Sequence, residues 1–174
     1  AFSGVLPIAN GGTGSSTQNF VDLSNNQTIS GYKSFSTNIN ANDIQIGKPS
    51  AGSQNTMLGE AVFAYGTPGS NNTALGFMTL TSLQGGDDNT AVGTNAIRQG
   101  GAANGSRNTA VGSSALSNGG ASNDNVAIGS YAMPASVTGS SNVALGSSAL
   151  YSNTSASYNV GVGFEALKNT TTGG

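Results

Sequence analysis

A nine-residue phrase occurs seven times between Asn55 and Leu167. Each copy begins with Asn, followed by Thr or Val, then a residue that is usually Ala, then a branched aliphatic residue and Gly. Two variable residues come next, then a residue that is usually Ala, and last a large apolar residue. The leading asparagines follow one another at steps of 17, 17, 19, 17, 17 and 17 residues, at Asn55, Asn72, Asn89, Asn108, Asn125, Asn142 and Asn159. A short fixed period indicates one structural unit stacked on itself, each unit burying its apolar residues against its neighbours. The sequence therefore predicts an elongated rod.

The composition excludes several other classes of protein. Only 7% of the residues are charged and the net charge is -2, whereas a globular domain usually carries about 25% charged residues. The chain has no Cys and no His, so it lacks thiolate ligands and the usual proton shuttle. Its few basic residues are scattered, and no apolar run approaches the roughly 18 residues that span a membrane. We predict no cofactor, no metal site, no nucleic-acid partner and no membrane insertion.

The chain divides into two predicted segments. Residues 1–48 lie outside the array and form a small β segment, and residues 49–174 form the repeat array. Alternation over residues 27–35 predicts two short strands around a turn, and residues 43–47 predict another brief strand. No segment shows the apolar spacing of a helix. One further step of the repeat from Asn159 would pass the last residue, so we expect the array to continue.

The fourth position after each asparagine is Gly in all seven copies, which marks a corner or a close approach of another backbone. The aliphatic residue before this Gly and the large apolar residue after it are five positions apart, so on a flat strand they would face opposite sides. A corner at the Gly would bring them to the same side. The predicted fold class is all-β: a parallel β-roll or β-helix of about seven 17-residue rungs, each with two short strands bent at the Gly and a polar turn.

The asparagine column has two interpretations at this point. Stacked rungs would place identical amides one above another, able to bond along the stack, or each Asn would be a turn residue with a left-handed backbone. Neighbouring strands lie about 4.7–4.9 Å apart, so seven rungs would make a rod roughly 33 Å long. Each rung has only two large apolar side chains to offset the entropy of ordering it. We therefore expect three chains to associate, with their Ala and aliphatic faces toward a common axis.

Two resemblances rest on quoted residues. The phrase Asn-Val-Ala-Ile-Gly at 125–129 resembles the head repeats of trimeric autotransporter adhesins, although those heads have a shorter period; the resemblance covers residues 55–167 and implies a trimer of left-handed parallel β-rolls. The phrase Asn-Val-Ala-Leu-Gly-Ser-Ser-Ala-Leu-Tyr-Ser-Asn at 142–153 is similar to arrays in bacteriophage tail fibres. So are Leu-Pro-Ile-Ala-Asn-Gly-Gly-Thr-Gly at 6–14 and Asn-Gln-Thr-Ile-Ser-Gly-Tyr-Lys-Ser-Phe at 26–35.

These resemblances imply a structural segment of a homotrimeric fibre used for attachment to a host cell surface, in a virion tail or otherwise extracellular. The implied partners are two further copies of the chain, other tail or fibre proteins, and a host-surface glycan. The alternative is a bacterial surface adhesin of the trimeric autotransporter type. That protein would carry a signal peptide and a membrane anchor elsewhere in its full chain.

Enzymatic and ligand-binding chemistry has few candidates. A glycosidase needs two carboxyl groups about 5–9.5 Å apart. The candidates are Asp87 and Asp88, adjacent in a turn, and Glu60 and Glu165, at opposite ends of the array. Solvated turn residues explain the Asp pair better, and a calcium-binding repeat is absent. We predict no catalytic residue and no enzyme activity, and we assign no ligand-binding residue.

Two further features leave alternatives open. Five aromatic residues could stack on sugars or could pack against a neighbouring rung or chain: Phe77, Tyr131, Tyr151, Tyr158 and Phe164. Ice binding by a flat threonine face is a third function, because Thr follows the asparagine in the first four copies. Val replaces Thr in the last three copies and breaks that column.

Overall fold

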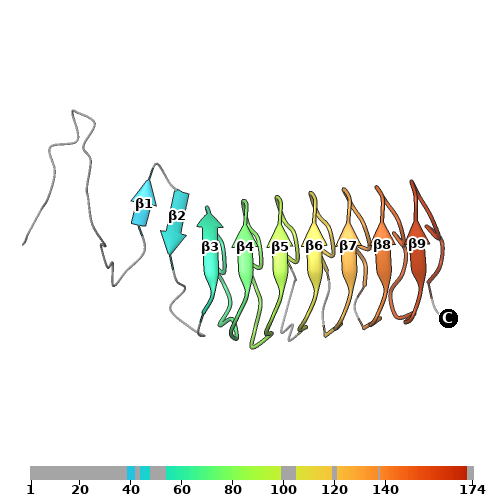
Figure 1. The fold of residues 1–174 in the computed structure, drawn as a ribbon, viewed down its shortest axis with the longest axis horizontal. Coiled ribbons are helices and arrows are strands. Elements are labelled where there is room, and N and C mark those ends of the chain that lie inside the picture. Colours follow the sequence, from blue (N-terminus) through green and yellow to red (C-terminus); the bar gives the residue numbers. More distant parts are fainter. Residues whose placement is uncertain are drawn as a thin grey trace, which may run out of the picture. The chain divides into compact units, whose positions relative to one another are not determined.

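A computed structural model describes residues 39–41, 44–47, 54–98, 105–118, 121–136 and 138–171. Its strands lie side by side in chain order as one sheet (Figure 1). They are β1 (Ile39–Ala41), β2 (Ile44–Gly47), β3 (Thr56–Gly59), β4 (Thr73–Leu75), β5 (Thr90–Val92), β6 (Thr109–Val111), β7 (Val126–Ile128), β8 (Val143–Leu145) and β9 (Val160–Val162). None of the described residues is helical. The prediction of an all-β fold is confirmed.

Among the described strands, β2 alone runs opposite to the others (Figure 1). β1 pairs antiparallel with β2, and β2 pairs antiparallel with β3. The brief strand predicted over residues 43–47 is therefore confirmed as Ile44–Gly47, and it lies against the first rung of the array. The two strands predicted within residues 27–35 lie outside the described residues.

The strands from β3 to β9 are parallel, and each position pairs with the same position of the next rung. Thr73 pairs with Thr90 and Thr90 with Thr109, although the second step is two residues longer. The extra residues therefore lie between the two strands and leave the strand register unchanged. The predicted parallel β-solenoid with one rung per repeat is confirmed.

The core of the solenoid lies inside the single chain. In a three-residue strand the middle side chain faces one side and its two neighbours face the other. The middle residue faces inward in every rung, and it is Ala in five of them. The large apolar residues four positions after the Gly are fully buried at Leu80, Ile97, Leu116, Met133 and Leu150. Small and large side chains thus fill a narrow interior together.

Two expectations about the rung were wrong. The aliphatic residue before each Gly faces outward, with 42% of Leu75 and 43% of Leu145 exposed, because it shares a strand face with the residue two positions earlier. The Ala residues accordingly face the core of their own chain and not a common axis. The segment after the Gly is a series of turns and not a second strand. Left-handed residues such as Met78 (φ 52°) and Leu80 (φ 51°) interrupt the extended backbone there.

The glycine column is a close approach between rungs, which is one of the two roles predicted for it. Gly112 has φ +132°, and a Cβ added to it would lie 2.6 Å from the carbonyl oxygen of Gly129 in the next rung. Gly93 and Gly146 have the same kind of contact with the next rung. Gly163, in the last rung, has φ +122° but no atom within 4 Å of such a Cβ. Gly93, Gly112 and Gly146 are therefore required both by backbone conformation and by space, and Gly163 by backbone conformation alone.

The asparagine column forms a buried amide ladder. The Nδ2 of Asn125 donates to the carbonyl oxygen of Gly139 (3.0 Å), which closes its own rung, and to the Oδ1 of Asn108 (3.2 Å) in the rung before. The Oδ1 of Asn125 accepts the backbone N–H of Asn142 (2.9 Å) in the rung after. The left-handed backbone belongs to the preceding residue, such as Asp124 (φ 59°). The ladder interpretation is therefore confirmed, and the left-handed Asn is not.

We expect Gly112→Ala to lower the free energy of unfolding by about 3 kcal/mol or more, because strain and a backbone clash combine. The matched control is Gly163→Ala, which has similar strain and no clash, and should cost roughly 1–3 kcal/mol. Urea denaturation followed by circular dichroism measures both. Equal losses would show that the rung-to-rung approach is not tight.

We expect Asn125→Asp to lower the free energy of unfolding by about 3 kcal/mol at neutral pH, since a buried carboxylate cannot donate the two Nδ2 hydrogen bonds. The exposed Asn169 is the control, and Asn169→Asp should change stability by less than about 0.5 kcal/mol. The same denaturation experiment compares them. A loss at Asn125 no larger than at Asn169 would contradict the role of the ladder.

Candidate interaction surfaces

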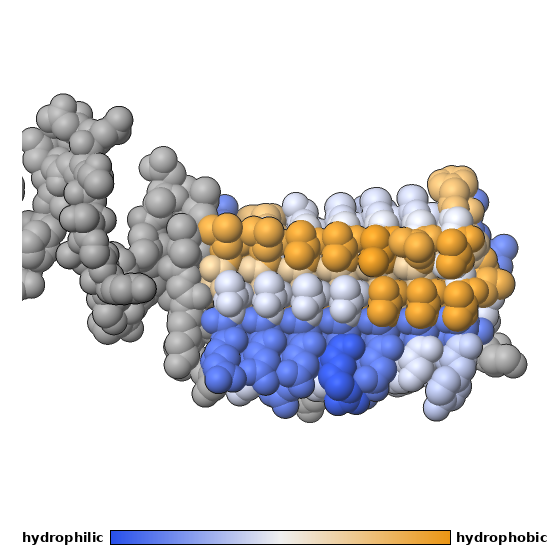
Figure 2. Space-filling view, in the orientation of Figure 1, coloured by the Kyte–Doolittle hydropathy of each residue, from blue (hydrophilic) through white to orange (hydrophobic). Residues whose placement is uncertain are grey.

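The outward face of strands β3 to β9, which we call the strand face, carries two columns of side chains. One column is the aliphatic residue before each Gly: Leu58, Leu75, Val92, Val111, Ile128, Leu145 and Val162. The other is the first residue of each strand, which is Thr in β3 to β6 and Val in β7 to β9. In Figure 2 the aliphatic column is an unbroken orange row, and the second row changes from pale to orange between β6 and β7. Neither column contains a charged residue.

Exposure of this kind is unusual for a β-sheet. Ile128 is 37% exposed in the middle of the sheet, and Val160 and Val162 in the last rung are 65% and 63% exposed. Scattered exposed apolar residues are normal on a protein surface, but a contiguous stripe usually marks an interaction site. The strand face is therefore the first candidate interaction surface.

The residues directly before the ladder asparagines, such as Asn71, Asp88, Arg107 and Asp124, make polar contacts between neighbouring rungs. Arg107 binds Asp124 through Nε to Oδ1 (2.6 Å) and Nη2 to Oδ2 (2.8 Å). This hydrogen-bonded pair raises the pKa of Arg107 and lowers the pKa of Asp124, with the opposite charges adding to the effect. Both side chains are exposed, so the pair adds little to stability. Their spacing of 17 residues, equal to the repeat, is the feature of the sequence that could have predicted this pair.

The carboxylates considered for catalysis lie at three separate places along the array. Asp87 accepts the backbone N–H of Ser70 and Asp88 accepts the Nδ2 of Asn71 (3.0 Å), so both take part in contacts between turns. Glu60 follows the glycine of the first rung, whereas Glu165 lies in the last rung and pairs with Lys168 (2.6 Å). Among the described residues, no group of three His, Cys, Asp or Glu side chains could hold a metal ion.

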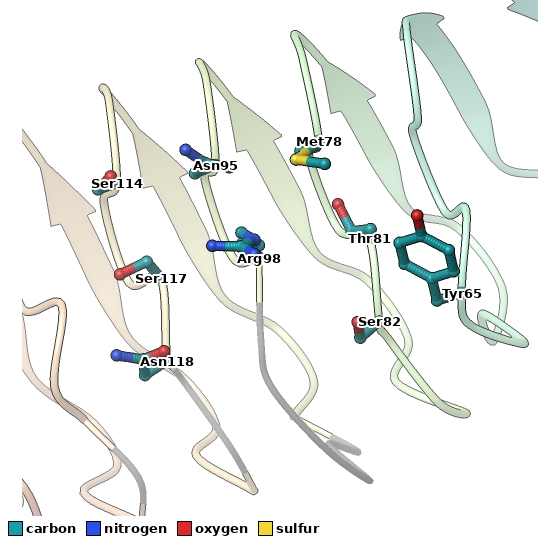
Figure 3. Close-up of a pocket in the computed structure, with 9 residues that line it drawn as sticks. All are labelled: Tyr65, Met78, Thr81, Ser82, Asn95, Arg98, Ser114, Ser117 and Asn118. Atoms are coloured by element: carbon teal, nitrogen blue, oxygen red, sulfur yellow. The ribbon is translucent and has the colours of Figure 1, made fainter.

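A polar groove of about 370 Å³ lies on the segment after the glycine corner, away from the strand face (Figure 3). Its lining residues come from the first four rungs: Tyr65, Met78, Thr81, Ser82, Asn95, Arg98, Ser114, Ser117 and Asn118. They stack in columns at the repeat spacing, for example Thr81, Arg98 and Ser117. The groove could not be predicted from the repeat, because its lining residues vary from copy to copy, although their regular spacing is visible in the sequence.

The five aromatic candidates all stay at least 40% exposed. Tyr131 and Tyr151, from neighbouring rungs, contact each other with ring centroids 6.4 Å apart. This pair therefore packs between rungs as one interpretation proposed, yet each ring keeps an open surface. Tyr65, which was not among the candidates, is 72% exposed at the groove.

Comparison with protein-family models, with curated proteins and with solved structures finds no match for this chain. In the described part of the chain, no helix has the length and apolar character needed to cross a membrane.

Proposed function

We propose that this chain is a structural segment of a homotrimeric fibre that attaches a phage or virus particle to a host cell surface. The observation that carries the proposal is the strand face, where an aliphatic column runs over seven consecutive parallel strands without a charge. Covering this column would remove exposed apolar area from water, which stabilises an assembly in proportion to that area. The resemblance to tail fibres and trimeric adhesin heads supplies the trimer and the attachment role.

A second copy of the chain is the occupant that best fits the strand face. Copies carry the same columns at the same rung spacing, so they can meet rung by rung along their whole length. The absence of charged side chains on the face means that no ion would have to be desolvated in the contact. The buried Ala and Leu columns take no part, because each chain uses them for its own core. The proposed role requires no enzyme activity.

We expect light scattering of the purified protein to give three times the 17.0 kDa mass of one chain. Ile128→Lys should convert this species to monomers, because it would bring three cations together in a buried contact. The control is Ser155→Lys, at an exposed turn position, which should leave the mass unchanged. Circular dichroism would show that both variants keep the β fold. A wild-type protein that stays monomeric at high concentration would overturn the proposed trimer.

Ice binding is a second candidate that one observation favours. Thr56, Thr73, Thr90 and Thr109 lie in register on the strand face, where a flat surface would present them at regular spacing. We expect no inhibition of ice recrystallisation by the purified protein, because the threonine column stops after the fourth rung. Inhibition that Thr90→Lys abolishes would instead establish the ice-binding function.

A further inference from the structure

The groove contains a cation that has no ion-pair partner among the described residues. Arg98 is exposed and forms no ion pair with a described residue, whereas Arg107 is paired with Asp124. No carboxylate lies among the described residues that line the groove. A guanidinium offers five donors in a planar fork that matches a carboxylate. The groove therefore has an open site for an anionic group in a protein whose net charge is -2.

The remaining polar groups around Arg98 are small hydroxyls and amides. The side chains of Ser82, Ser114 and Asn118 make no hydrogen bond with a described residue. Ser117 Oγ donates to the carbonyl oxygen of Pro134 (3.4 Å), which leaves its oxygen free to accept. Hydroxyl and amide groups both donate and accept, so together they match a ligand that carries many hydroxyl groups. This lining suits a sugar better than an apolar ligand.

Aromatic rings lie at or near both ends of the groove. Tyr65 is in the first rung and is largely exposed. Beyond the other end, Tyr131 continues the column of Asn95 and Ser114, and Tyr151 lies against Tyr131. From the first to the fourth rung the groove crosses three rung steps, or about 14 Å at the spacing of neighbouring strands. A chain of several sugar rings fits this length, with rings at either end able to stack on apolar sugar faces.

We propose that the groove binds a carboxylate-bearing oligosaccharide, with Arg98 holding a sugar carboxylate, the Ser and Asn side chains bonding ring hydroxyls, and Tyr65 stacking on a ring. This inference rests on the proposed attachment function and gives its ligand class. The groove lies on a different segment from the strand face, so the proposed contact between copies does not use its lining residues.

The probe is tri-galacturonate, titrated into the full chain by isothermal titration calorimetry, with neutral galactotriose and short polyglutamate as comparisons. We expect tri-galacturonate to bind with a dissociation constant of roughly a millimolar or tighter, and to bind at least about tenfold more tightly than either comparison. Arg98→Ala should weaken binding at least about tenfold, and Tyr65→Ala should weaken it less. The matched control, Arg107→Ala, removes an exposed cation outside the groove and should bind as the wild type does.

Three results would overturn the inference. They are no binding of tri-galacturonate, equal binding by Arg98→Ala and wild type, and tighter binding of polyglutamate, which would indicate an acidic peptide as ligand. Circular dichroism and light scattering on the same samples separate the two proposals. A trimer that binds no tri-galacturonate would support the proposed fibre and contradict the proposed ligand. A monomer that binds tri-galacturonate would support the proposed ligand and contradict the proposed trimer.

Discussion

The buried asparagine ladder is the interaction on which the rest of this structure depends. In the four inner rungs that begin at Asn89, Asn108, Asn125 and Asn142, the amide closes its own rung, bonds the rung before and accepts a backbone N–H from the rung after. No other side chain of this size combines two donors with an acceptor in one neutral group. Because the ladder fixes where every rung begins, position by position stacking follows along the whole array. The longer third repeat shows this, since its extra residues leave the strand pairing in register.

Sequence reasoning found the positions where a single residue type is required. Asn and Gly recur in every copy. The Asn side chain satisfies buried backbone groups, and the Gly leaves room for the neighbouring backbone, because a Cβ added at Gly112 would lie 2.6 Å from the carbonyl oxygen of Gly129. These requirements are visible as an exact repeat. The fold class and the rung length follow from the same spacing, as does the parallel order of the strands.

The errors came from treating apolar character as a sign of burial. Successive side chains of a strand face opposite sides. The small middle residue therefore faces the core and Leu75 faces outward, so the aliphatic column lies on the surface. A second strand was expected because a corner at the Gly would bring Leu75 and Leu80 to the same side. The backbone is instead left-handed at Met78 and Leu80, a conformation that their residue types do not favour. Tertiary packing sets that conformation, since Leu80 is fully buried there and its backbone N–H bonds the rung after it (3.1 Å).

The two candidate surfaces require different patterns of side chains along the stacked rungs. The strand face needs the same kind of side chain on every rung, because a partner of the same period meets all rungs alike. The groove needs different side chains on successive rungs, because a ligand presents different groups along its length. Residues such as Arg98 lie outside the core, so changing them leaves the ladder and the glycine column intact. A change in the ladder instead disturbs its own rung and both neighbours. The groove columns are therefore the part of this fold in which recognition can change at the smallest cost in stability.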